Sequence, residues 1–157
     1  MIKKVRVDYR LIHGQVTSKW MQVIDADTIF IVSDEIMKDE LKRSVMRLAV
    51  PFGVKLVIKN VNDAIEALNS GVTDKYKLFI LCEKIDAVYR LSKAVPEIKE
   101  INIGTTLAQE DKKLVSRAIY LTELEILQLK ELLSAGIDIN IQMIPSESPI
   151  KMETVLP

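Results

Sequence analysis

The stretch from Arg6 to Val16 concentrates the side chains of this chain that could do chemistry. It contains the only histidine, His13, together with Arg6, Arg10 and a glycine, Gly14. A neutral imidazole is a nucleophile at pH 7. Guanidinium groups match the charge that spreads over the oxygens of a phosphoryl group in transfer. This combination indicates phosphoryl transfer or the binding of an anion.

Plainer explanations exist for the same residues. A lone histidine is more often structural than catalytic, and Arg10 could simply pair with Asp8 on the surface. Other catalytic sets are missing, because the sequence has no serine nucleophile elbow and its one cysteine, Cys82, lies in an apolar run typical of a core strand. One His and one Cys cannot supply a typical zinc site, and no acidic cluster surrounds His13, so we expect neither a metal nor a cofactor.

The elements that position these residues alternate between two patterns. Short apolar runs rich in β-branched residues predict strands at 2–8, 28–32, 54–58, 78–82 and 101–103. Longer amphipathic segments predict helices at 14–24, 35–49, 61–69 and 85–95, and one that opens at Thr122 and ends before Gly136. The alternation predicts an α/β fold with an open, mainly parallel, doubly wound sheet of about six or seven strands and helices on both faces.

The last third of the chain has a different pattern. Residues 137–143 alternate strictly between apolar and polar side chains, which predicts a strand with one polar face near a sheet edge, where antiparallel pairing is feasible. A further short strand is placed at 115–119. No linker or repeat divides the sequence, so we expect one domain over residues 1–157.

Doubly wound sheets bind ligands at the carboxyl ends of their strands. The loops at 8–14, 33–35, 83–85 and 104–109 are therefore the ones expected to meet at a site. His13 should lie at the N-terminus of the first helix, where the helix dipole favours a neutral imidazole and the N–H groups could hold an attached phosphoryl group. Gly14 would let the backbone approach that group closely.

Composition excludes several classes of protein. The chain has 22 Lys and Arg against 22 Asp and Glu, so its net charge is zero, and an affinity for nucleic acid is not expected. No apolar run approaches the ~18 residues of a membrane span, and the N-terminus lacks the pattern of a secretory signal. We expect a cytoplasmic protein. Its Leu- and Ile-rich faces are compatible with a homo-oligomer as well as with the sheet core.

The segment Asp8-Tyr9-Arg10-Leu11-Ile12-His13-Gly14-Gln15-Val16 closely resembles the phosphorylation-site motif of a known family. These are the IIB components of the bacterial phosphoenolpyruvate-dependent sugar phosphotransferase system (PTS), of the mannose/fructose/sorbose family. The resemblance covers essentially the whole chain. Three further stretches carry it: Val32–Glu35 with Lys38-Asp39, Ala49–Lys55, and Glu100–Gly104. The chain departs from the family at Thr105-Thr106, where a Gly-Met pair is usual.

The resemblance implies a phosphocarrier enzyme, a protein-histidine phosphotransferase of the sugar PTS. His13 would accept a phosphoryl group from a phosphohistidine of a IIA domain and pass it to a sugar that the membrane components IIC and IID import. Asp8 would support His13. The residues implied to stabilise the phosphoryl group are Arg6, Arg10, Gly14 and Gln15.

Two other functions remain open at this point. One is a non-catalytic α/β regulator, in which His13 and the arginines only hold an anion or a nucleotide. The sequence contains neither Gly-x-Gly-x-x-Gly nor Gly-x-x-x-x-Gly-Lys-Ser/Thr, which argues against a nucleotide. The other is a degenerate paralogue that acts only as a regulatory partner, against which the intact His13 motif argues.

Overall fold

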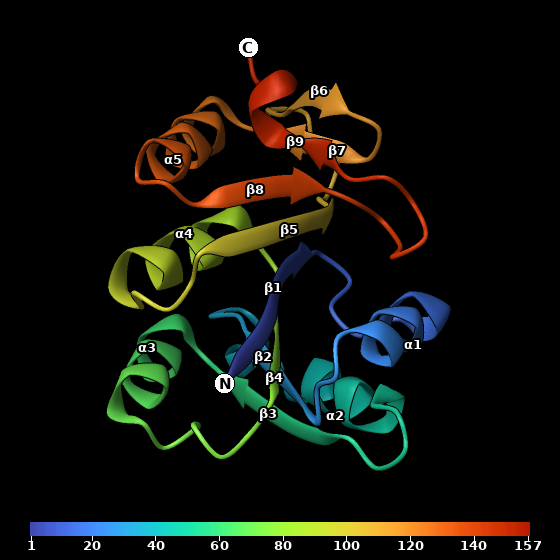
Figure 1. Cartoon of the computed structure of the whole chain (residues 1–157). Helices are drawn as coiled ribbons and strands as arrows, with labels where there is room; N and C mark the ends of the chain where they lie inside the picture. Colours follow the sequence, from blue (N-terminus) through green and yellow to red (C-terminus); the bar gives the residue numbers. More distant parts are fainter.

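The alternation of apolar runs and amphipathic segments produces one large sheet with helices on both faces (Figure 1). The structure is a computed structural model and describes residues 1–157. The strands of the sheet are β1 (Ile2–Asp8), β2 (Thr28–Val32), β3 (Lys55–Lys59), β4 (Leu78–Cys82), β5 (Glu100–Thr105), β8 (Asp138–Ile141) and β9 (Ile150–Lys151). The helices are α1 (Gly14–Val23), α2 (Glu40–Ala49), α3 (Val61–Ser70), α4 (Ile85–Ala94) and α5 (Glu123–Ser134). Single 3-10 turns occupy Ile36–Lys38 and Met152–Thr154.

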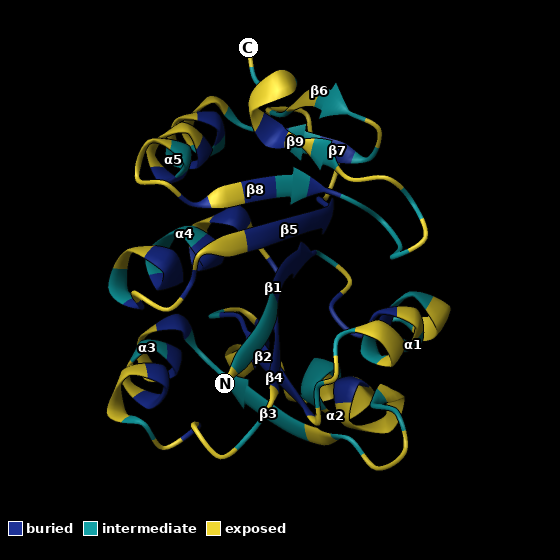
Figure 2. Ribbon diagram, viewed as in Figure 1, coloured by how far each residue is buried: buried dark blue, intermediate teal, exposed yellow.

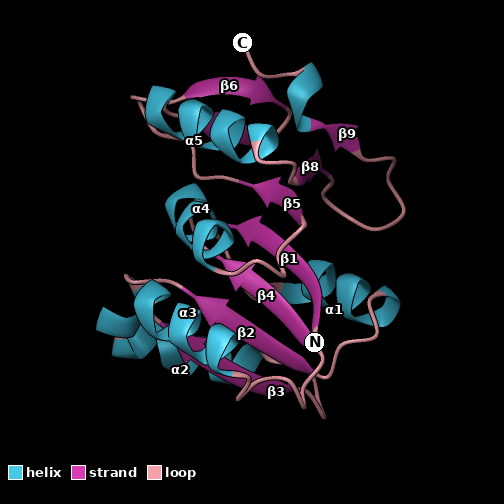
Figure 3. Ribbon diagram, turned by 60° about the vertical axis from the view of Figure 1, so that its left-hand side comes forward, coloured by secondary structure: helices cyan, strands magenta, loops and turns pink.

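The seven strands follow the order β3-β2-β4-β1-β5-β8-β9, which Figure 3 shows rising from β3 at the bottom. Every pair is parallel except the last, in which β9 runs antiparallel to β8. The predicted fold class is therefore confirmed. The antiparallel edge is formed by the short β9, whereas the alternating segment itself, β8, is parallel to β5.

The helices divide between the two faces of the sheet according to the direction in which the chain crosses it. Helices α1 and α2 cover one face, and α3, α4 and α5 cover the other (Figure 1). The chain leaves β1 toward β2 but leaves β4 toward β5, so the direction reverses between the neighbouring strands β1 and β4. Such a reversal is the place where doubly wound sheets bind ligands, outside the carboxyl ends of the strands.

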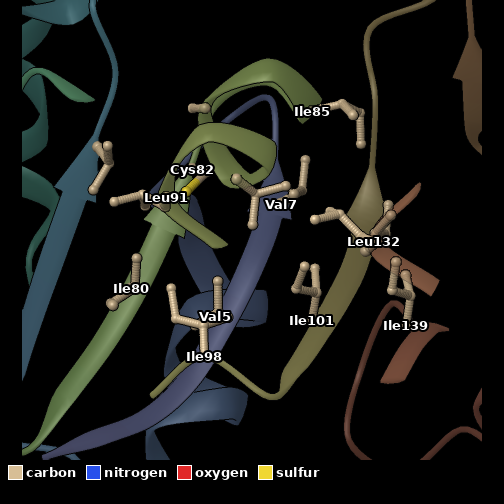
Figure 4. Close-up of a cluster of buried hydrophobic side chains, with 14 of the residues drawn as sticks. Val5, Val7, Ile80, Cys82, Ile85, Leu91, Ile98, Ile101, Leu132 and Ile139 are labelled. Atoms are coloured by element: carbon tan, nitrogen blue, oxygen red, sulfur yellow. The ribbon is translucent and has the colours of Figure 1, made fainter. Parts of the chain in front are cut away.

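The two faces carry cores of unequal size. The α3–α5 face buries a cluster of 28 residues, part of which Figure 4 shows around Val5, Ile80 and Leu91. Cys82 belongs to this cluster, and its complete burial raises the pKa of the thiol, as expected for a core cysteine. The hydrophobic cluster on the α1–α2 face has only nine buried residues, among them Trp20 of α1.

The helix expected over 35–49 is shorter than predicted. Asp39 adopts an extended conformation, and its side chain accepts a hydrogen bond from the Lys42 N–H at 2.9 Å. This N-cap starts α2 at Glu40 and separates it from the 3-10 turn. Met46 is the only buried residue of α2, so most of its apolar pattern faces outward.

The prediction of a single strand at 115–119 is wrong. Residues 113–121 form a hairpin, β6 (Lys113–Ser116) and β7 (Ile119–Leu121), which makes a separate two-stranded sheet. Arg117, with φ of 33°, makes the turn. A turn at this position leaves too few residues on either side to give a periodic pattern in the sequence.

Candidate functional site

The loop that joins β1 to α1 is held from inside the protein. Leu11 and Ile12 are buried in the core beneath α1, and the Leu11 N–H donates to the Asp8 carbonyl at 2.9 Å. Leu11 has φ of 58°, a left-handed conformation that costs a residue with a side chain about 1–2 kcal/mol. The buried leucine side chain offsets that cost, and Tyr9 and Arg10 are left at the surface of a well-defined loop.

His13 is the N-cap residue of α1, as the sequence predicts. Its backbone N–H donates to Thr17 Oγ1 at 3.0 Å. No side chain caps the first turn of the helix, so the N–H groups of Gly14 and Gln15 have no partner within the chain. Gly14 has φ of 48°, which glycine adopts without strain. The arrangement offers donors to an anion beside the imidazole.

Asp8 lies directly behind the imidazole and is almost completely buried. Its Oδ2 is 2.8 Å from His13 Nε2. Its Oδ1 accepts hydrogen bonds from the Arg10 backbone N–H and from Thr105 Oγ1, both at 3.0 Å. The carboxylate is thus satisfied on both oxygens and fixes the orientation of the ring.

These contacts decide which nitrogen of His13 carries the proton. Burial disfavours the charged form of Asp8, but the hydrogen bond and charge of His13, the charge of Arg6 and the Arg10 N–H together hold the pKa of Asp8 below its ordinary value. An ionised carboxylate only accepts hydrogen bonds, so Nε2 must be the donor. In the neutral ring the free lone pair is then on Nδ1.

Arg6 lies deeper than the sequence suggests, with only 1% of its side chain exposed. Nη1 bonds to Asn102 Oδ1 and donates to the Gln142 carbonyl at 2.8 Å. Nη2 donates to the Met143 carbonyl at 3.0 Å and to Asp8 Oδ2 at 3.3 Å. Burial lowers the pKa of Arg6, and the adjacent carboxylate works against that shift. The guanidinium thus reaches His13 only through Asp8.

A glycine makes room for this guanidinium. A Cβ atom at Gly104 would lie 2.1 Å from Arg6 Nη2, far inside van der Waals contact. On its other side Arg6 packs against Trp20, with Cζ 5.1 Å from the ring centroid. Trp20 in turn donates its indole N–H to the Met143 carbonyl at 3.0 Å. Arg6 is therefore clamped between β5, α1 and the loop after β8.

Arg10 differs from Arg6 in both its exposure and its contacts. Its side chain is exposed, lies over the Tyr9 ring at 5.8 Å from the centroid, and forms no ion pair. The surface pair of Arg10 with Asp8 is not present, because Asp8 takes the Arg10 backbone N–H instead. The Arg10 guanidinium is thus available to a group carried by His13.

The structure brings most of the predicted site residues together around His13. Asp8 contacts the imidazole, Gly14 and Gln15 form the adjacent helix N-terminus, and Arg10 lies on the same loop. Sequence reasoning placed residues 104–109 at the site but assigned no role to Asn102, Gly104 or Thr105 of β5. The departure at Thr105 gave a signal, since it follows a strand that ends beside β1, but its bond to Asp8 depends on strand register.

The described residues contain no group of three or more His, Cys, Asp or Glu side chains placed to hold a metal ion. None of the helices is both long and apolar enough to cross a membrane.

Fold and site together define a class: a doubly wound α/β protein whose only histidine, bonded to a buried carboxylate, lies in the loop that follows its central strand. Residues 2–157 match the family described as PTS system sorbose subfamily IIB component, and the chain belongs to this family. The resemblance of the sequence to the IIB components of the mannose/fructose/sorbose family is confirmed.

Three relatives illustrate the match. The sorbose-specific EIIB component of Lacticaseibacillus casei is 32% identical and covers 94% of this chain and 90% of its own. The IIBSor domain of the sorbose permease from Klebsiella pneumoniae has a TM-score of 0.92 at 28% identity, over 97% of this chain and 93% of that one. The mannose-specific EIIAB component of Escherichia coli K12 is 27% identical over 97% of this chain, which matches 47% of that longer protein.

Membership of this family means that the protein is a phosphotransferase of the sugar PTS and a phosphocarrier. Components of this kind work with a IIA component and with membrane components IIC and IID. The alternative of a non-catalytic regulator that binds an anion or a nucleotide is not favoured.

Proposed function

We propose that residues 1–157 act as one IIB unit in which His13 is the phosphorylated residue and Nδ1 the reacting atom. The observation that carries the proposal is the 2.8 Å contact of Nε2 with the ionised Asp8. Because the Nε2–H group donates a hydrogen bond to Asp8, the lone pair of the ring is on Nδ1, and this atom attacks the phosphorus of phospho-IIA. The new bond between Nδ1 and phosphorus forms as the donor's phosphorus–nitrogen bond breaks, and the donor imidazole leaves.

The surroundings of His13 suit both halves of the reaction. As the ring becomes cationic on phosphorylation, Asp8 stabilises it through the hydrogen bond at Nε2. The exposed Arg10 guanidinium and the N–H groups of Gly14 and Gln15 then hold the phosphoryl oxygens. Arg6 contributes in this proposal by keeping Asp8 ionised and in place, rather than by contacting the phosphate.

The sugar is the acceptor in the second half-reaction. Its hydroxyl oxygen attacks the phosphorus on His13, the bond to Nδ1 breaks, and the hydroxyl proton is released. The sorbose- and mannose-specific names of the relatives support a hexose as the acceptor. We place the protein on the cytoplasmic side of the membrane, where it meets IIA and the IIC and IID components that import the sugar.

The test is phosphorylation of the purified chain by phosphoenolpyruvate, the general PTS carrier proteins and the cognate IIA. We expect an acid-labile, base-stable mass gain of one phosphate, with NMR correlations from phosphorus to the ring that identify Nδ1. His13→Ala should take up no phosphate and change the free energy of unfolding by no more than about 1 kcal/mol, because the ring is partly exposed. Uptake of phosphate by the His13→Ala protein would overturn the assignment of His13 as the phosphorylated residue, since the chain has no other histidine. Phosphate on Nε2 would refute the role of Asp8.

A further inference from the structure

Helix α2 presents an apolar stripe to the outside of the molecule. Leu41, Val45 and Leu48 have relative exposures of 76%, 50% and 88%, and Phe52, just past the end of the helix, is fully exposed. In Figure 2 most of α2 is coloured as exposed, while β2 and β4 beneath it are dark. Nothing in the chain covers this stripe, so it is a candidate docking surface.

The spacing of the stripe is that of a helix that packs against another helix. Leu41, Val45 and Leu48 follow one another at intervals of four and three residues, the pattern of a coiled-coil seam. Ser44 lies beside Val45 and is small enough to let a second helix approach closely. The seam is only one helix long, which fits a pair of short helices rather than an extended coiled coil.

The same residues are self-complementary when α2 meets a second α2 in the antiparallel direction. The register that sets Leu41 against the partner's Leu48 also sets Ser44 against the partner's Val45. Twofold symmetry repeats both contacts, so each large side chain of the seam meets an apolar side chain or a small one. This complementarity between the two copies follows from the order of the residues along α2.

The charges beside the stripe support the same register. Glu40 and Arg47 are seven residues apart, so they lie on the same side of α2, and both are exposed with no ion pair in the chain. In a twofold antiparallel pair each side of the helix faces its own copy. Glu40 and the partner's Arg47 would then be offset by two residues, or about 3 Å along the axis. Two symmetric ion pairs would form, one on each end of the seam.

We propose that the exposed face of α2 binds a second copy of this chain, as an antiparallel α2–α2 dimer. A surface with a purely basic border would instead suit anionic lipid, but one side of this stripe carries the acidic Glu40 and the basic Arg47 at matching positions, and Lys42 on the other side is bonded to Glu83. The two sheets would run antiparallel across the interface. Each His13 is at the carboxyl edge of its sheet, so the two histidines would face opposite ends of the dimer and stay accessible.

The test is sedimentation velocity of the full chain over a wide range of concentrations. A seam of this size is small, so we expect a reversible monomer–dimer equilibrium. Leu48→Glu should weaken the dimer by roughly 30-fold or more, because it places a charge in both of the symmetric Leu41–Leu48 contacts of the seam. Leu127→Glu, at an exposed leucine of α5, is the matched control and should leave the equilibrium unchanged.

Charge reversal distinguishes this register from any other use of the stripe. Glu40→Arg and Arg47→Glu should each weaken the dimer by roughly tenfold. The double variant should recover most of the affinity, because the two ion pairs reform with their signs exchanged. A monomer at every concentration overturns the proposal, as does a dimer that survives Leu48→Glu or a double variant that is not rescued. Phosphorylation of His13 is measured on the same samples and should be unaffected, so the two proposals fail independently.

Discussion

Two arginines that look alike in the sequence have opposite environments in the structure. Arg6 is buried, with both terminal nitrogens bonded to protein acceptors, whereas Arg10 is exposed and unpaired. A surface pair between Arg10 and Asp8 was one explanation of the sequence, and the structure replaces it with a bond from the Arg10 backbone. Under the proposed function these positions give the two arginines different tasks: Arg6 organises the Asp8 carboxylate, and Arg10 contacts the phosphoryl group on His13.

Arg10→Lys tests the outer role. Lysine keeps the charge but loses the planar fork that can bind two phosphoryl oxygens at once. We expect phosphorylation of His13 to slow by about ten- to a thousandfold, measured by rapid-quench mass analysis. The free energy of unfolding should change by less than about 0.5 kcal/mol, because the side chain is exposed. Arg47→Lys on α2 is the control, and transfer at the wild-type rate in Arg10→Lys would show that Arg10 does not contact the phosphate.

Asp8→Asn tests the inner role through its dependence on pH. The pKa of Asp8 is lower in the folded protein than its ordinary value of about 3.9, so the ionised carboxylate stabilises the fold above that pH. That contribution is lost as the pH falls through the lowered pKa. In urea unfolding, Asp8→Asn should cost about 3 kcal/mol at pH 7, since it leaves the buried Arg6 without its counter-charge. The difference from wild type should shrink below pH of about 4. Asp138→Asn, at an exposed carboxylate, should show no such pattern, and a constant difference at all pH values would contradict the account.

At the scale of elements, the site depends on strands that are distant in sequence. Most helices and strands follow from hydrophobic periodicity, and His13, Gly14 and Asp8 could be placed from the strand–loop–helix pattern alone. The contacts of Arg6 could not, because they need Asn102 and Gly104 on β5 and two carbonyls after β8. Parallel pairing of β1 with β5 brings Asn102 beside Arg6, and no local pattern in the sequence encodes that register.

Gly104→Ala tests this coupling between β5 and the loop. The added methyl group would overlap the Arg6 guanidinium, which is held by several hydrogen bonds and cannot move without breaking some of them. We expect a loss of about 1–3 kcal/mol in the free energy of unfolding. Because Arg6 positions Asp8, phosphorylation of His13 should also slow, even though residue 104 does not touch the imidazole.

Gly53→Ala is a suitable comparison. A Cβ at this position meets no atom within 4 Å, but alanine would strain the backbone, which has φ of 80°. It should destabilise the protein without slowing phosphoryl transfer. An unchanged transfer rate in Gly104→Ala would show that Arg6 is not needed to orient Asp8.

For the whole molecule, the two faces of the sheet differ in how firmly their helices are attached. Helix α4 buries five residues against the larger core, whereas α1 buries only Thr17 and Trp20. The fold class could be predicted because it depends on alternation along the chain. The unequal sizes of the two cores could not be predicted, because they depend on which face of the sheet each helix covers. They also depend on a row of polar side chains on the α1 side of the sheet, formed by Arg6, Asn102 and Asn140.

Hydrogen exchange should reveal this asymmetry. Backbone amides of α1 should exchange roughly tenfold or more faster than those of α4, because fewer buried contacts oppose local opening. Mass spectrometry of peptides from the two helices gives the comparison directly. Equal protection of α1 and α4 would mean that the sheet and its helices open only as a unit, and that the helix carrying His13 is as stable as the main core.

The packing of Trp20 against Arg6 has a practical consequence for following the reaction. Trp20 is the only tryptophan, it is almost completely buried, and its ring lies on the guanidinium that holds Asp8. Indole fluorescence depends on nearby charge, so a change in the charge and hydrogen bonding of His13 reaches the fluorophore through two intervening groups. If His13 is the phosphorylated residue, as proposed, we expect the fluorescence of Trp20 to change on phosphorylation and so to report the reaction with no label and no radioactive phosphate.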